Sequence, residues 1–103
     1  MFDITDIKGT AELSNKVQMP YLGLGVYLSQ DGDEVINAIH WALEAGYRHI
    51  DTAALYMNET GVGKAINTSG ISRKEIFVTT KVWNSDQGYE KTMRAFNESL
   101  NKL

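Results

Sequence analysis

The sequence predicts an α/β protein in which parallel strands alternate with helices. Three observations carry this prediction. Short runs rich in β-branched and apolar residues alternate with segments of helical periodicity, the connections are short, and a polar turn near the start separates two further strand-like segments. Strands and helices that alternate on short connections form parallel sheets with right-handed crossovers. The predicted order is a hairpin followed by three strand–helix units.

The predicted hairpin occupies residues 9–20. Its two strands, residues 11–13 and 17–19, flank the polar turn Ser14-Asn15-Lys16, and Pro20 closes the unit. Short alternating segments around such a turn are typical of antiparallel strands.

Three strands of a parallel sheet are expected at residues 21–26, 49–51 and 76–81. The first contains Gly23 and Gly25. Glycines inside a strand indicate a close approach of another backbone.

The first helix is expected between Asp31 and Gly46. Asp31 as N-cap, with Glu34 three residues later, is an aspartate version of the capping box. Gly46 stops the helix as the residue after the C-cap. The apolar residues that define its inner face are Val35, Ile39, Ala42 and Leu43.

Two further helices follow the same logic. Asn58 is expected to cap the second helix, and Ser72 with Glu75 predicts a single turn before the third strand.

The last helix runs to Leu103 without a stop signal, which favours a chain that ends within a longer protein. The inner residues of the second helix are Val62, Ala65 and Ile66. The periodic apolar residues of the last are Tyr89, Met93, Phe96, Leu100 and Leu103.

Composition narrows the class of protein. The 103 residues are 43% hydrophobic and 22% charged, with a net charge of −3 and no cysteine. These values are those of an ordinary globular domain, give no reason to expect nucleic acid or membrane partners, and fit a cytoplasmic location. The N-terminal ten residues lack the apolar core of a signal peptide.

Three polar residues stand where parallel α/β folds place reactive groups, at and after the carboxyl ends of strands. They are Asp51, Tyr56 and Lys81, here called the trio. A tyrosine hydroxyl can protonate a carbonyl oxygen during reduction, a neighbouring ammonium can tune it, and a carboxylate can orient that ammonium. Without further context, an aspartate–lysine pair with a nearby tyrosine is more often a solvated ion pair than a catalytic group.

The local sequence resembles the aldo-keto reductase family. Residues 46–53 (Gly-Tyr-Arg-His-Ile-Asp-Thr-Ala), followed by Glu59 and Val62-Gly63, are similar to the family signature. Residues 23–27 (Gly-Leu-Gly-Val-Tyr) resemble its first barrel strand and residues 77–83 (Phe-Val-Thr-Thr-Lys-Val-Trp) its third. The match covers nearly the whole chain and is closest in type to bacterial diketogluconate and glyoxal reductases.

The resemblance implies that residues 1–103 are the N-terminal portion of one TIM (β/α)8 barrel domain. The hairpin would plug the bottom of the barrel, and residues 21–103 would form its first three βα units. A complete barrel needs about 250 residues. The resemblance also implies NADPH-dependent reduction of aldehydes and ketones to alcohols, without a metal and by a full-length monomer.

The resemblance assigns roles to individual residues. The trio would be catalytic, with Tyr56 as proton donor. The backbone around Gly25 and Val26, with the side chain of Asp51, would contact the cofactor. Tyr27 and Trp83 would line the pocket for a small carbonyl substrate.

One departure from the family limits this chain. The family's catalytic histidine closes the fourth strand, which would lie beyond Leu103. His40 and His49 are expected to pack or face solvent instead. The 103-residue chain alone is therefore expected to be inactive.

Two other interpretations stay open at this point. The chain could be a non-catalytic half-barrel module that self-associates to cover its sheet edges. A small flavodoxin-like domain that binds FMN is the third interpretation. The stretch Gly61-Val62-Gly63-Lys64 lacks the third glycine of a dinucleotide fingerprint and is better explained by helix packing.

Overall fold

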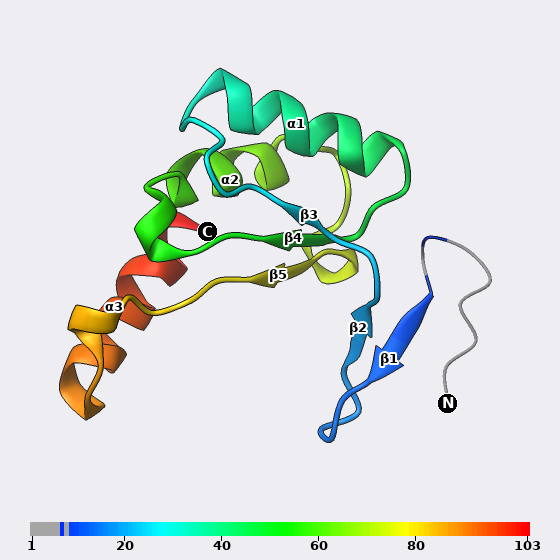
Figure 1. Cartoon of the computed structure of the whole chain (residues 1–103). Coiled ribbons are helices and arrows are strands. Elements are labelled where there is room, and N and C mark those ends of the chain that lie inside the picture. The colour runs from blue at the N-terminus through cyan, green and yellow to red at the C-terminus, as the bar shows by residue number, and fades with distance from the viewer. Residues whose placement is uncertain (1–6, 8) are drawn as a thin grey trace.

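The fold of this protein is described from a computed structural model, and the description covers residue 7 and residues 9–103. Within them, strands and helices follow the predicted order: two hairpin strands, then three parallel strands separated by helices (Figure 1). The expectation of no signal peptide falls mostly on residues outside this description.

The hairpin consists of β1 (Thr10–Glu12) and β2 (Gln18–Pro20), paired antiparallel with Thr10 opposite Pro20. Each strand is displaced by one residue from its prediction, and Pro20 is the last strand residue. Proline fits there because a two-stranded sheet has only edge strands, which tolerate a missing N–H donor.

The parallel sheet has the order β3-β4-β5, formed by Leu24–Gly25, His49–Asp51 and Phe77–Thr79. The middle strand matches its prediction, whereas the outer two are shorter than the predicted 21–26 and 76–81. The reason lies in the middle strand, which has only three residues with which its neighbours can pair. The register places Gly25 opposite Asp51 and Asp51 opposite Thr79.

Helix α1 (Asp33–Glu44) ends as predicted. Gly46 has φ +107°, its N–H donates to the Leu43 carbonyl, and the Tyr47 N–H donates to the Ala42 carbonyl. These two bonds form a Schellman motif. The glycine therefore terminates the helix because it adopts the left-handed conformation at little cost.

The start of α1 differs from the prediction. The N-cap is Gly32 and makes no side-chain capping bond. Asp31 is not the cap, because its Oδ1 atom accepts a hydrogen bond of 2.8 Å from the Gly61 N–H in the next helix. Glu34 does reach back, but to the Gln30 N–H.

Helices α2 (Glu59–Asn67) and α3 (Tyr89–Lys102) complete the pattern, and a single 3-10 turn at Arg73–Glu75 confirms the predicted short element before β5. Its N-cap is Ser72, but no side chain caps this turn. A further turn at Asn84–Asp86 was not predicted.

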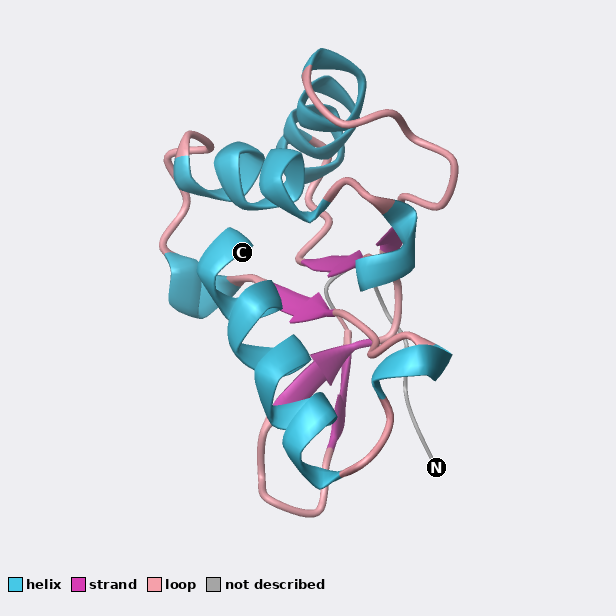
Figure 2. Ribbon diagram, turned by 90° about the vertical axis from the view of Figure 1, so that its left-hand side faces the viewer, coloured by secondary structure: helices cyan, strands magenta, loops and turns pink. Residues whose placement is uncertain are grey.

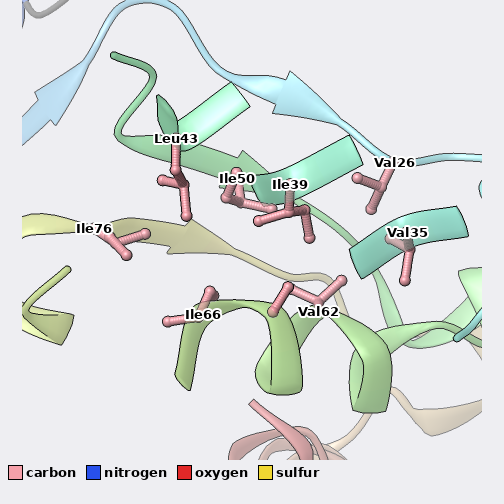
Figure 3. Close-up of a cluster of buried hydrophobic side chains, with 9 residues drawn as sticks. Val26, Val35, Ile39, Leu43, Ile50, Val62, Ile66 and Ile76 are labelled. Carbon is pink, nitrogen blue, oxygen red and sulfur yellow. The ribbon is translucent and has the colours of Figure 1, made fainter. Parts of the chain in front are cut away.

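An apolar cluster joins α1, α2 and the sheet (Figure 3). All predicted inner residues of α1 and α2 are buried. The cluster consists of Val26, Val35, Ile39, Leu43, Ile50, Val62, Ala65, Ile66 and Ile76.

Two glycines of α2 allow this close packing. A Cβ atom on Gly61 would lie 2.4 Å from Asp31 Oδ1 and 2.6 Å from Val35 Cγ1. A Cβ atom on Gly63 would lie 2.0 Å from the Lys102 carbonyl oxygen. Both glycines lie inside the helix, so the Gly-Val-Gly-Lys stretch serves helix packing and not phosphate binding.

Helix α3 packs less completely than the other two. Among its described residues only Ser99 is buried, and the predicted apolar stripe is largely exposed, with Tyr89 at 85%, Phe96 at 52% and Leu100 at 60%. Figure 2 shows the long helices gathered on one side of the strands. Leu103 packs against the apolar cluster of the core, whereas the rest of the stripe on α3 follows helical periodicity but stays exposed.

Candidate active site

The trio converges at the carboxyl edge of the parallel sheet. Asp51 is the last residue of β4, and Tyr56 ends the 3-10 turn Ala54–Tyr56. Lys81 was predicted to close the third strand but lies just beyond β5, where its carbonyl accepts from the Ala54 N–H at 3.2 Å. The sequence therefore identified residues that the fold does bring together.

The Lys81 ammonium is the centre of this arrangement. Its Nζ atom lies 2.8 Å from Asp51 Oδ1 and 3.0 Å from the Thr52 carbonyl oxygen. It also donates a longer hydrogen bond of 3.5 Å to the Tyr56 hydroxyl and stands 5.2 Å from the centroid of the Tyr56 ring. One cation thus links the carboxylate to the phenol.

The surroundings of Lys81 favour its charged form. Partial burial alone would lower the pKa of Lys81, but hydrogen bonds to Asp51 and Tyr56, with the charge of Asp51, outweigh it and raise that pKa above 10.5. The side chains of Lys81 and Asp51 are 48% and 37% exposed, so solvent screens the pair. Lys81 therefore stays protonated at neutral pH.

Tyr56 is held in place by aromatic contact as well. Its ring lies 5.1 Å from the ring of Tyr27, at an interplanar angle of 53°. The residue after it, Met57, has φ +58° and ends the turn. The Tyr56 side chain is half-buried, so a ligand at the sheet edge can reach its hydroxyl.

A pocket of about 260 Å³ opens beside the trio. Trp83, which was predicted to line a substrate pocket, does line this one together with Tyr56 and Lys81. Tyr27 does not line it and is 64% exposed, although its ring touches Tyr56. The remaining lining residues are Ala53, Leu55, Val82 and Asn84.

The two predicted cofactor-binding residues of β3 and its loop differ in accessibility. A Cβ atom on Gly25 would meet nothing within 4 Å, so the space beside this exposed glycine, opposite Asp51, is open. Val26 is fully buried, its N–H donates to the Asp51 carbonyl, and its own carbonyl accepts from Asn58. Gly23 shows the predicted close approach instead, since its Cβ would lie 3.0 Å from the His49 ring.

Sequence reasoning missed the polar side chains beneath the trio. Thr52, Asn58 and Glu59 are buried, and Thr80 is half-buried beside them. Asn58 is the N-cap of α2 by position, as predicted, yet its side chain makes no capping bond. The available signal was the polar run Asn58-Glu59 within the family-like segment, of which only Glu59 was noted as part of the motif.

Both histidines are engaged away from the trio. The Nε2 atom of His40 lies 3.0 Å from the Ala65 carbonyl oxygen, and the two ring nitrogens of His49 pair with Pro20 and Thr79.

In the described residues no group of three or more histidine, aspartate or glutamate side chains could hold a metal ion. No helix in the same part of the chain is long and apolar enough to span a membrane.

Comparison with known proteins identifies the family. The profile of the aldo/keto reductase family matches residues 9–103, and the chain belongs to this family. A solved structure of a Bombyx mori aldo-keto reductase in complex with NADP superposes with a TM-score of 0.84 at 39% identity. That match covers 96% of this chain and 35% of the silkworm protein.

Two curated relatives share much of this sequence. A 9,11-endoperoxide prostaglandin H2 reductase from Trypanosoma cruzi is 66% identical over 91 residues, which are 88% of this chain and 32% of that protein. The glyoxal reductase of Bacillus subtilis is 52% identical over 99 residues, 96% of this chain and 36% of that protein. The chain spans about a third of the length of the curated relatives it matches.

Proposed function

We propose that these residues carry the proton-transfer half of an NADPH-dependent carbonyl reductase that converts aldehydes and ketones to alcohols. The single observation behind this proposal is the Lys81 ammonium, which contacts the Asp51 carboxylate and the Tyr56 hydroxyl together. Family membership supports the reaction class.

The proposed chemistry places a proton donor next to a fixed cation. When a carbonyl carbon accepts a hydride, its oxygen gains negative charge, and the Tyr56 hydroxyl donates its proton to that oxygen. The phenolate left on Tyr56 is stabilised by the Lys81 ammonium, and Asp51 holds the ammonium in position. The 3.5 Å contact between Lys81 and Tyr56 is long, as such contacts are in ligand-free sites, and it would shorten as charge develops.

The residues at the sheet edge fit a nicotinamide cofactor. The open space beside Gly25, opposite Asp51, would accept a flat ring against the backbone, where a larger side chain would intrude. Gly25 and Asp51 would hold the ring, and Val26 would contribute through the fixed position of its peptide group. The bound cofactor supplies the hydride. The NADP complex of the silkworm relative supports this choice.

The activity would belong to a whole (β/α)8 barrel domain. Residues 1–103 would be its N-terminal portion, with the hairpin at 9–20 and the first three βα units at 21–103. Coverage of about a third of each relative supports this assignment. The B. subtilis relative favours glyoxal-type and other small carbonyl substrates, and the exposed ring of Trp83 would form one wall of their pocket.

The test is Tyr56→Phe in the intact gene product that contains these residues. We expect NADPH oxidation with methylglyoxal or an aromatic aldehyde to fall at least about 100-fold, the lower end of what loss of a general acid costs. NADPH binding, followed by quenching of protein fluorescence, should persist.

Tyr89→Phe is the matched control, because Tyr89 loses the same hydroxyl on the exposed face of α3. Its turnover should equal that of the parent. If Tyr56→Phe keeps near-normal turnover, Tyr56 is not the proton donor.

A second candidate is a non-catalytic module that self-associates. The exposed apolar stripe of α3 is the observation that favours it. An intact gene product without carbonyl reductase activity, but with a stable multimeric state, would support this candidate instead.

A further inference from the structure

The buried polar side chains at the start of α2 lie between the segments that carry the candidate active site. Asn58 is fully buried and uses its whole carboxamide. Its Nδ2 atom donates to the carbonyls of Val26 and Ser29 at 3.0 Å each, and its Oδ1 atom accepts from Thr52 Oγ1 at 2.8 Å. The side chain therefore ties the loop after β3 to the end of β4.

Glu59 extends this connection to the third strand. Glu59 is 3% exposed, and its carboxylate accepts a 2.7 Å hydrogen bond from the Thr80 hydroxyl. As the first residue of α2, it also lies where the helix dipole favours a negative charge. Asn58 and Glu59 together thus contact all three segments that follow the parallel strands.

Three of the four partners of this pair are chain neighbours of residues at or beside the site, and the fourth, Ser29, lies in the loop after β3. Thr52 follows Asp51 and Thr80 precedes Lys81. Val26 precedes Tyr27, whose ring touches Tyr56.

The Asn58 side chain can make these inward hydrogen bonds because another residue caps helix α2. The Gly61 N–H, an otherwise unpaired donor in the first turn of α2, is satisfied by Asp31 from the loop after β3. An N-cap asparagine ordinarily makes such a bond itself. The carboxamide of Asn58 is thereby free to face inward.

We propose that Asn58 and Glu59 are positioning residues that hold Asp51, Tyr56 and Lys81 in register with the Gly25–Tyr27 segment. A buried amide with every donor and acceptor paired specifies one arrangement, since any displacement leaves a polar group unsatisfied in the interior. Displacement of a catalytic group by about 1 Å can cost about 100-fold in rate. The expected loss of kcat rests on the proposed function. The expected loss of local order rests on the hydrogen bonds alone.

The first test is Asn58→Asp in the intact gene product. Aspartate keeps the shape and the acceptor but loses both N–H donors to the carbonyls of Val26 and Ser29. We expect kcat to fall on the order of 100-fold while KM for the carbonyl substrate changes far less, because the pocket walls stay in place. Asn67→Asp makes the same replacement at the exposed end of α2 and should leave kcat unchanged.

A milder pair of variants covers the case in which Asn58→Asp does not fold. Thr52→Val removes only the hydroxyl that donates to Asn58, whereas Thr52→Ser keeps it. The valine variant should lose kcat and the serine variant should recover most of it. A valine variant that keeps the parental kcat, or that loses no more than the serine variant, would overturn the role of the hydrogen bond.

Hydrogen exchange distinguishes failure of this inference from failure of the proposed function. Asn58→Asp should accelerate amide exchange in residues 26–30 and 52–57 together, and Asn67→Asp should not. If the parent enzyme is inactive but this paired loss of protection appears, the reductase proposal fails and the positioning role stands. If the parent is active, and Asn58→Asp leaves both kcat and the two segments unchanged, the positioning role is wrong.

Discussion

At the scale of single residues, Lys81 shows how one side chain acquires its properties from three partners. Only one of them, Asp51, is charged, while the Thr52 carbonyl and the Tyr56 hydroxyl contribute dipoles. Because the pair is partly exposed, its effect on folding is small, and its main consequence is that the ammonium stays charged and stationary beside Tyr56.

The raised pKa of Lys81 leads to a pH-dependent prediction. A lysine whose pKa is higher in the folded state stabilises the fold fully below its unfolded-state value of 10.5 and loses that contribution as pH rises through the folded-state pKa. Lys81→Met should therefore lower the free energy of unfolding by less than about 1 kcal/mol at neutral pH. The difference from the parent should vanish in strong alkali.

The measurement is urea unfolding of the parent and the variant between neutral and strongly alkaline pH. Lys91→Met, at an exposed position on α3, provides the control for loss of a lysine charge. A destabilisation by Lys81→Met that grows with pH would contradict the assigned direction of the pKa shift.

At the scale of elements, two side chains fasten the loop after β3 to helix α2. Asp31 was expected to cap α1 and instead caps α2 from outside, whereas Asn58 occupies the N-cap of α2 and turns inward. The carboxylate of Asp31 gains from the positive end of the α2 dipole as well as from the Gly61 N–H. The two elements are consequently fastened by side chains and not only by apolar packing.

The hydrogen bond from the Gly61 N–H to Asp31 predicts the effect of removing the Asp31 carboxylate. Asp31→Ala should destabilise the protein by about 1 kcal/mol, the usual cost of losing a cap, because the Gly61 N–H is left unpaired. Asp31→Asn retains an oxygen that can accept the bond and should lose less. Chemical denaturation of the three proteins gives the comparison, and an equal loss in both variants would assign the effect to charge alone.

At the scale of the whole molecule, the described chain leaves the two edges of its parallel sheet unpaired and the apolar stripe of α3 exposed. The outer strands β3 and β5 each pair on one side only, and the stripe on α3 is exposed. A second pocket of about 260 Å³, lined in part by Val78, Phe96 and Leu100, lies between β5 and this stripe. Unpaired strand edges and apolar patches promote association.

We therefore expect the 103-residue chain, produced alone, to self-associate through this stripe. Phe96→Glu with Leu100→Lys should shift it toward the monomer because charged side chains replace the apolar surface that association would bury. Light scattering coupled to size-exclusion chromatography measures the change. Glu98→Lys with Asn97→Glu, on exposed positions of the same helix, is the control. Identical masses for parent and stripe variant would exclude the stripe as the contact.

The sequence by itself determined the order of the elements, the inner faces of α1 and α2, the stop at Gly46 and the membership of the trio. These features depend on local rules: periodicity of apolar residues, the left-handed preference of glycine, and the position of polar residues after strands. The motif around Asp51 also indicated the protein family.

Only the tertiary structure decided which partners the polar side chains choose. The Asp31–Gly61 bond spans 30 residues and the Asn58–Val26 bond spans 32, so no local pattern could rank them above a local cap. The same holds for the exposed stripe of α3, whose periodicity shows a helix but not its neighbour. A side chain with several possible hydrogen-bond partners takes those that the packed core brings within reach, and that choice is made only when distant segments meet.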